Sequence, residues 1–233
     1  MTRLTISLLG PFQATLDGEA IAFATDKVRA LLGYLVVEAQ HAHRRDTLAG
    51  LLWPDHPQNK ARQNLRQALS SLRKALHEPE TPDNGECAEG AFLTITRDTV
   101  QFNAQLEVSV DVTTFDALHE MCKNHRHRRL ETCRICLQRL GTMAALYKGE
   151  FLEQFFLSDS EPFEEWALFK RERHHIHMVE TLTVLAHYAE RRGEIAQACE
   201  FVQRQVTLEP WREEAHRDLM RLLAREGQRS AAL

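Results

Sequence analysis

Apolar and polar residues alternate along the first part of the chain. Leu4–Leu8 and Phe12–Leu16 each show the two-residue period of a strand with one buried face. Asp17-Gly18 is a typical hairpin turn, and the apolar pattern returns over Ala20–Phe23. The pattern predicts a small antiparallel sheet at the start of the chain.

The apolar spacing then changes to three and four residues, which is the period of a helix packed on one side. Thr25 is a suitable cap for a helix over Asp26–Ala39, and Asp46 is a suitable cap for a shorter helix over Thr47–Trp53. A third and more regular helix is predicted over Gln58–His77.

Two further alternating segments, Phe92–Thr96 and Thr99–Phe102, follow an acidic loop over Glu78–Gly90. They predict a second hairpin around Arg97-Asp98. A sheet, three helices and a hairpin, in that order, form a winged helix-turn-helix. From Val108 onward we expect only helices.

A repeat is visible in the second half of the chain. Gly193 and Gly227 are related by the period of tetratricopeptide repeats, and the same shift places Leu185 on Leu219. Such repeats are stacked pairs of helices. Leu233 falls inside the expected second helix of a repeat, so we expect the sequence to be part of a longer protein.

The predicted helix Gln58–His77 carries five cations and no carboxylate. Such a helix can neutralise DNA phosphates, and Arg and Gln side chains can form paired hydrogen bonds with base edges. The candidates for DNA contact on this helix are Lys60, Arg62, Gln63, Arg66, Gln67, Ser70, Arg73 and Lys74. A solvated amphipathic helix is the alternative, and Arg73 or Lys74 could instead pair with acids of the sheet.

Composition adds limited information. The 233 residues allow one or two domains. The net charge of −4 is poor support for nucleic-acid binding, but a local concentration of cations can still attract DNA. The sequence has five cysteines, no signal peptide and no apolar run of membrane-spanning length. We therefore expect a cytoplasmic protein with reduced thiols that does not contact the membrane.

Two sequence segments resemble a known DNA-binding domain. RRDTLAGLLWPD, which begins at Arg44, and NKARQNLRQALSSLRKAL, which begins at Asn59, are similar to that of the antibiotic-regulatory-protein (SARP-type) activators. Those domains are variants of the OmpR/PhoB-type winged helix. The resemblance covers roughly residues 3–103.

The second half resembles the next domain of the same family. YKGEFL, DSEPFEEW and WREEAHRDLM, which begin at Tyr147, Asp159 and Trp211, are similar to the bacterial transcriptional activation domain that follows the winged helix. This second resemblance runs from about residue 110 to the last residue.

The two resemblances together imply a mainly α fold with small antiparallel β-sheets. A winged helix-turn-helix DNA-binding domain would occupy residues 1–105, and an all-α, tetratricopeptide-like bacterial transcriptional activation domain would occupy residues 106–233. The family implies double-stranded DNA as a partner, bound as a homodimer at direct repeats near a promoter, and contact with RNA polymerase. The basic helix would enter the major groove, and Arg97 at the hairpin tip would reach a phosphate or the minor groove.

A second group of candidate residues lies in HEMCKNHRHRRLETCRIC, which spans His119–Cys136. Close pairs of thiolate and imidazole ligands joined by a short loop are typical of structural zinc sites. The preferred zinc ligands are Cys122, His125, Cys133 and Cys136, with His127 as the alternative to His125.

Other interpretations of this segment stay open. Cys133 and Cys136 could be buried apolar thiols on a helix, with the histidines in a solvated basic loop. A redox Cys-x-x-Cys pair is a third interpretation, although no βαβ pattern lies nearby. A separate run, Glu172–His177, places its histidines around a helix, and we expect a surface helix there.

The sequence contains no glycine-rich phosphate loop, nucleophile elbow or HExxH motif, so we do not expect an enzyme. The leading hypothesis is a sequence-specific DNA-binding transcriptional activator. The alternatives are a helical-repeat scaffold for protein interaction and a metal- or thiol-responsive regulator.

Overall fold

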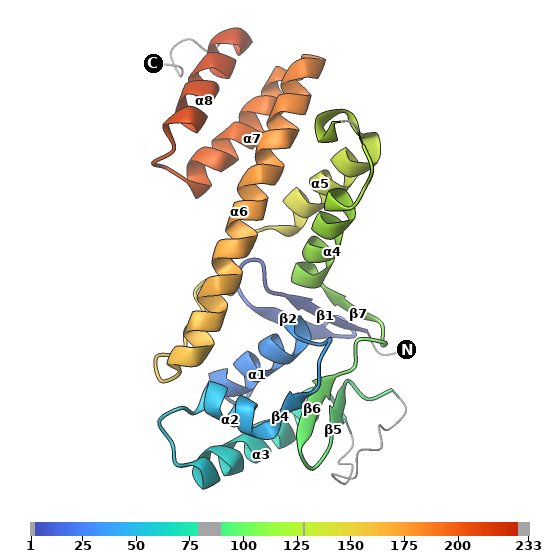
Figure 1. Cartoon of the computed structure of the whole chain (residues 1–233), viewed down its shortest axis with the longest axis vertical. Coiled ribbons are helices and arrows are strands. Elements are labelled where there is room, and N and C mark those ends of the chain that lie inside the picture. The colour runs from blue at the N-terminus through green and yellow to red at the C-terminus, as the bar shows by residue number, and fades with distance from the viewer. Residues whose placement is uncertain (1–2, 79–89, 128, 228–233) are drawn as a thin grey trace. The chain divides into compact units, whose positions relative to one another are not determined.

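The computed structural model describes residues 3–78, 90–127 and 129–227 (Figure 1). Two compact units are present. The first unit contains Met1–Thr113 and Phe151–Lys170, and the second unit contains Thr114–Glu150 and Arg171–Leu233. Residues 79–89, most of the predicted acidic loop, lie outside the described residues.

The sheet predicted at the start of the chain is present, but its third strand covers Glu19–Ala20 and not the predicted Ala20–Phe23. It has the order β3-β2-β1-β7, formed by β1 (Leu4–Ser7), β2 (Gln13–Leu16), β3 (Glu19–Ala20) and β7 (Val108–Val110). β1 and β2 are antiparallel, with Leu4 opposite Leu16. Asp17 and Gly18 join β2 to β3, with Leu16 opposite Glu19, and have positive φ angles of 52° and 88°, as a tight hairpin turn between right-twisted strands requires.

The prediction that the chain is helical from Val108 onward is wrong for β7. This strand runs parallel to β1, with Val108 opposite Leu4. Asp111 then begins α4 (Asp111–Lys123), and its carboxylate accepts hydrogen bonds of 2.8 and 2.9 Å from the backbone N–H groups of Leu8 and Leu9. Three residues are too few to reveal a period, so the strand becomes apparent only beside its partner.

The three helices predicted in the first unit are confirmed as α1 (Asp26–Val37), α2 (Arg45–Leu52) and α3 (Gln58–Ala75). The Thr25 hydroxyl accepts a hydrogen bond of 3.4 Å from the Val28 N–H group, which makes it the expected cap. The prediction that Asp46 caps α2 is wrong, because Arg44 occupies the cap position and Asp46 lies inside the first turn. Trp53, which follows α2, is buried.

The second predicted hairpin is also confirmed, and it forms the wing. β5 (Leu93–Ile95) and β6 (Thr99–Phe102) are antiparallel, with Leu93 opposite Phe102. β6 also pairs with β4 (His43–Arg44), a two-residue strand that the sequence pattern did not reveal. The pairing of β4 fixes the residue at which α2 begins.

The segment Phe151–Lys170 packs with the first unit, although it follows the predicted domain boundary at residues 105/106. Isolated bridges join Leu9 to Phe151 and Pro11 to Glu153. The Trp166 indole N–H group donates to the Glu38 carboxylate at 3.0 Å, and Lys170 lies 2.7 Å from the same carboxylate. The packing units therefore differ from the domains inferred along the sequence.

Helices form the second unit. α4 is followed by a 3-10 turn, η1 (Leu130–Thr132), and then by α5 (Arg134–Leu146), α6 (Glu161–Arg192), α7 (Ile195–Leu208) and α8 (Glu213–Glu226). The residues of α4 up to Thr113 and of α6 up to Lys170 belong to the first unit.

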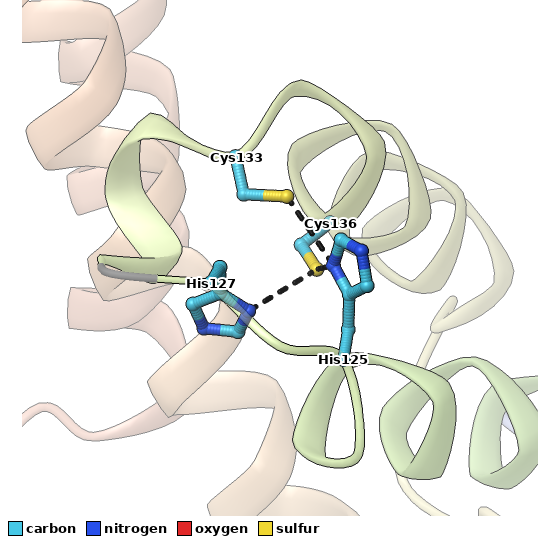
Figure 2. Close-up of side chains that lie close together, drawn as sticks. All are labelled: His125, His127, Cys133 and Cys136. Carbon is cyan, nitrogen blue, oxygen red and sulfur yellow. Dashed lines mark hydrogen bonds between the residues drawn. The ribbon is translucent and has the colours of Figure 1, made fainter.

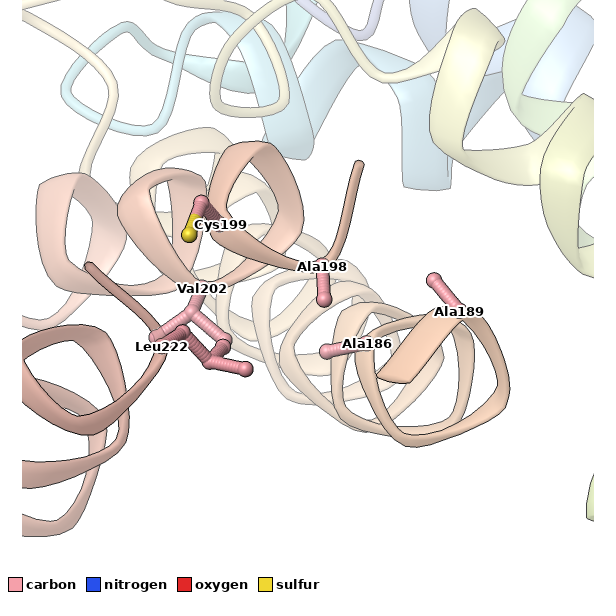
Figure 3. Packing of buried hydrophobic residues seen from close by; sticks show 6 residues of the cluster. All are labelled: Ala186, Ala189, Ala198, Cys199, Val202 and Leu222. Carbon is pink, nitrogen blue, oxygen red and sulfur yellow. The ribbon is translucent and has the colours of Figure 1, made fainter. Parts of the chain in front are cut away.

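Small side chains let the last three helices pack closely. Figure 3 shows an apolar cluster in which alanines of α6 and α7 lie beside Val202 and Leu222. Gly193 and Gly227 end α6 and α8 with positive φ angles of 78° and 87°, a conformation that glycine adopts without steric cost. Both glycines of the sequence repeat therefore end a helix in the same left-handed conformation, as expected for a helical-repeat domain.

The surface-helix prediction for Glu172–His177 is wrong for His174. This side chain is 0% exposed, and its Nε2 atom lies 3.1 Å from Asp116 Oδ1. The His177 ring stacks on His119 at 3.8 Å, and burial lowers the pKa of His177 to about 4. Tertiary partners on α4 explain the error.

Among the described residues, no helix has the length and apolar character needed to cross a membrane.

Candidate DNA-binding face and metal cluster

The helix α3 separates its apolar and polar residues cleanly. Its buried side consists of Ala61, Leu65, Ala68, Leu69 and Leu72. Six of the predicted contact residues are exposed on the other side and Ser70 is half-buried: Lys60, Arg62, Gln63, Arg66, Gln67, Ser70 and Lys74. We call this set the basic face of α3.

Arg73 does not belong to the basic face, so the prediction that its side chain is available for DNA contact is wrong. Its side chain is only 9% exposed. The nearby Glu78 carboxylate accepts hydrogen bonds from the backbone N–H groups of Phe92 and Leu93 at the start of the wing. Burial raises the pKa of Glu78, and the Arg73 charge counters part of that rise. Arg73 therefore supports the junction between α3 and the wing.

A groove of about 380 Å³ lies beside the basic face. Its lining comes from the start of α2, from α3 and from the turn of the wing: Arg44, Arg45, Asp46, Arg62, Leu65, Arg66, Arg97 and Asp98. Of its five arginines, Arg44 and Arg45 were not among the residues expected to contact DNA. The signal for them was the paired arginines at the start of RRDTLAGLLWPD, which had served only to establish the family resemblance.

Arg45 holds the turn of the wing against α2. Its guanidinium donates to the Thr96 carbonyl at 3.0 Å, and its backbone N–H group donates to the Asp98 carbonyl at 2.9 Å. Arg97 lies between these two anchored residues and is exposed. The wing therefore presents Arg97 to solvent from a fixed turn.

Arg62 and Asp46 form the charged pair inside the groove. The guanidinium donates to both carboxylate oxygens, with N–O distances of 2.5 and 2.7 Å. These hydrogen bonds lower the pKa of Asp46, so the carboxylate is charged at neutral pH. The pair fixes the plane of the Arg62 guanidinium but also offsets its positive charge.

A cluster of metal-ligating residues lies in the second unit (Figure 2). In the described part of the chain it consists of His125, His127, Cys133 and Cys136, whose candidate ligand atoms all lie within 4.8 Å of one another. His125 Nδ1 is 3.1 Å from Cys136 Sγ and 3.4 Å from Cys133 Sγ, and His127 Nδ1 is 3.9 Å from Cys136 Sγ. Figure 2 shows the four side chains converging from the loop after α4 and the start of α5.

Cys122, one of the preferred ligands, lies outside this cluster. It is buried, and its thiol donates to the Cys136 carbonyl at 3.8 Å. Both histidines, which the sequence had offered as alternatives, belong to the cluster instead. Burial raises the pKa of the Cys136 thiol to about 12, while the Cys136 backbone N–H group lowers the pKa of Cys133.

The first unit is a winged helix-turn-helix with a basic face, and the second unit is built from helices of the tetratricopeptide type. This combination defines a class of transcriptional regulators. Residues 110–233 match the bacterial transcriptional activator domain, and the chain belongs to that family.

Similar proteins agree with this assignment. The chain is 39% identical over 74 residues to the transcriptional regulatory protein EmbR of Mycobacterium bovis, and equally to EmbR of Mycobacterium tuberculosis. The match covers 32% of this chain and 19% of those relatives. The resemblance to SARP-type regulators expected from the sequence is thereby confirmed.

A solved structure shows the same fold. The structure of Mycobacterium tuberculosis EmbR in complex with a low-affinity phosphopeptide matches with a TM-score of 0.69 and 21% identity. That match covers 100% of this chain and 57% of EmbR, so this chain spans a little over half of that protein.

Proposed function

We propose that this chain is a sequence-specific DNA-binding transcriptional activator in which α3 enters the major groove of promoter DNA. The observation that carries the proposal is the basic face of α3, where cations and amides are exposed on a helix without a carboxylate of its own. A helix of this kind can both neutralise phosphates and reach base edges.

The groove beside α3 extends this surface. Arg44, Arg62, Arg66 and Arg97 are exposed in it or at its rim. If each of these four arginines replaces one counterion, log K for DNA should fall against log [salt] with a slope of about −4 per protomer. The phosphate contacts that cause this salt dependence provide affinity and positioning, while contacts with bases provide specificity.

The roles of individual residues follow from their positions. Gln63, Arg66 and Gln67 are exposed on neighbouring turns of α3, so we assign them to base edges. Arg44 and Arg97 flank the groove from α2 and the wing, so we assign them to phosphates or, for Arg97, to the minor groove. Lys60 and Lys74 lie near the two ends of α3, where contacts to phosphates are more suitable.

The second unit would supply contacts with other proteins. We expect the chain to bind as a homodimer at direct repeats, to contact RNA polymerase and to act in the bacterial cytoplasm without catalysing a reaction. Membership of the activator family supports a role in transcription. EmbR is a transcriptional regulatory protein by name, which supports the same role for this chain.

The test combines selection and salt titration. The full chain is incubated with a random pool of duplex DNA, the bound sequences are recovered, and the affinity for the enriched site is measured at several salt concentrations. A recurring sequence motif and a steep salt slope are expected. Failure to enrich any sequence, together with an affinity that does not change with salt, would contradict the proposal and favour a protein-interaction scaffold.

A further inference from the structure

The connection between α4 and α5 has a composition that cannot fold by burying apolar surface. Residues 123–132, KNHRHRRLET, contain four Lys or Arg residues, and Leu130 provides the apolar side chain. Segments of this composition generally stay unfolded unless something else orders them. Nevertheless, this connection contributes His125 and His127 to the compact cluster with Cys133 and Cys136.

We propose that this cluster binds one zinc ion through His125 Nδ1, His127 Nδ1, Cys133 Sγ and Cys136 Sγ. Four protein ligands complete a tetrahedron and leave no position for a water molecule. The ion is therefore structural, and it joins the end of α4 to the beginning of α5. It takes no part in a reaction.

The distances in the cluster suit a tetrahedral ion. Zinc lies about 2.3 Å from sulfur and about 2.0 Å from nitrogen, which separates a sulfur and a nitrogen ligand by about 3.6 Å. The separations of 3.1, 3.4 and 3.9 Å lie on both sides of this value. Small side-chain rotations would therefore suffice to equalise them around an ion.

The start of α5 places two thiols on one side of the cluster. Cys133 occupies the cap position of α5, and Cys136 lies three residues later in its first turn. A Cys-x-x-Cys pair at this position can chelate an ion from one side, while the two histidines approach from the loop.

The charges also balance. The two thiolates offset the two positive charges of zinc and the two imidazoles bind as neutral ligands, so the site needs no further acid. The segment also contains the cations Arg126 and Arg129, which would repel an uncompensated metal ion, so the negative charges of two thiolates are needed to hold zinc there. Zinc and its four ligands therefore carry no net charge together.

The other thiols serve as internal comparisons. The four cysteines in the described part of the chain, Cys122, Cys133, Cys136 and Cys199, are free. Cys199 lies in the apolar cluster of α7, and Cys122 packs behind Cys136 as a second buried thiol. Buried cysteines of that kind behave as small apolar side chains. Cys133 and Cys136 differ from them because two imidazoles face them.

Metal content provides the first experiment. The full chain, produced without a histidine tag, is purified and analysed for metals and for free thiols. About one zinc per chain is expected, because the four ligands form one tetrahedral site. Replacing zinc by cobalt should give the visible absorption of a four-coordinate ion together with sulfur-to-metal charge transfer.

Matched variants locate the ligands. Cys133→Ser and His125→Asn should each lower bound zinc to a small fraction of the wild-type content, and both positions are accessible enough to tolerate the change. Cys122→Ser and Cys199→Ser should retain the full zinc content. A strong chelator should lower the melting temperature of the wild-type chain but leave that of Cys133→Ser unchanged.

Three outcomes would overturn the proposal. Zinc retained in Cys133→Ser would identify an adventitious ion. Zinc lost in Cys122→Ser but retained in His127→Asn would restore the ligand set preferred from the sequence. A metal-free chain whose thiols are reduced, or are joined in a Cys133–Cys136 disulfide, would favour buried or redox thiols. None of these measurements depends on DNA binding, so they test the zinc site separately from the proposed function.

Discussion

Arg62 on α3 donates two hydrogen bonds to Asp46 on α2, with N–O distances of 2.5 and 2.7 Å. Both side chains are substantially exposed, at 49% and 38%. Exposed ion pairs contribute little to folding stability, so this pair is better explained by positioning than by stability. It links the two helices of the helix-turn-helix at the groove that we propose as the DNA-binding surface.

Asp46→Asn should strengthen non-specific DNA binding at low salt. The substitution removes a negative charge from the groove and releases Arg62 to contact a phosphate. The stability of the chain should change little, because both partners of the pair are exposed. Affinity for a random duplex and the unfolding curve provide the two measurements. Weaker binding in this variant would instead show that Asp46 orients Arg62 for DNA.

Arg66→Ala should reduce affinity for the selected DNA site by about 1–3 kcal/mol if Arg66 contacts a base. Arg66 is exposed on α3, so its removal should have little effect on the melting temperature. Arg217→Ala removes the same charge from the exposed side of α8 and serves as the matched control. Equal affinities for the wild type and Arg66→Ala would be incompatible with the proposed orientation of α3.

Trp53→Ala should destabilise the chain by about 3–5 kcal/mol, since the side chain is nearly fully buried. Trp53 is 8% exposed, and the Lys27 amine lies 6.0 Å from its ring centre and donates to the Leu52 carbonyl. Trp211 is 76% exposed, so Trp211→Ala should change stability by less than about 0.5 kcal/mol. Chemical unfolding followed by circular dichroism would compare the two. A stable Trp53→Ala chain that has lost DNA binding would show that Trp53 contacts DNA.

The first unit should lose stability in acid because the Glu38 carboxylate becomes protonated. Burial acts to raise the pKa of Glu38, but hydrogen bonds from Lys170 and Trp166 outweigh it and hold the pKa below the ordinary 4.5. As the pH falls below that value, the unfolded chain takes up the proton before the folded chain does. The stability provided by the carboxylate is therefore complete above the unfolded pKa and is lost as the pH falls through the folded pKa.

Glu38→Gln should accordingly be less stable than the wild type at neutral pH, and the difference should shrink as the pH is lowered through 4.5 and below. Urea unfolding at a series of pH values, followed by tryptophan fluorescence, measures the difference. Glu150→Gln is a suitable control, because Glu150 is 55% exposed and its nearest partner, Arg171, is 3.6 Å away. A difference between wild type and Glu38→Gln that stays constant with pH would contradict the assignment.

The sequence by itself determined the elements that local pattern controls. The Asp17-Gly18 turn, the Thr25 cap and the amphipathic period of α3 each depend on residues close together in the chain, and all three are confirmed. The basic side of α3 was also recognisable, because charge on a helix surface follows directly from residue spacing. The segment around Tyr147 indicated the family through its residues alone, and the match over residues 110–233 confirms it.

Tertiary structure decided what depends on distant partners. β7 is a strand because it lies beside β1. Arg73 and His174 can be buried because Glu78 and Asp116 lie near them and offset the cost of burying a polar side chain. The candidate metal ligands followed the same rule. Spacing identified the segment, but the path of the loop after α4 brought both histidines to the thiols of α5 and left Cys122 behind them. The apolar period of a helix or strand shows which of its sides faces the core. Which residues it contacts there depends on the path of the rest of the chain, because those residues are distant in the sequence.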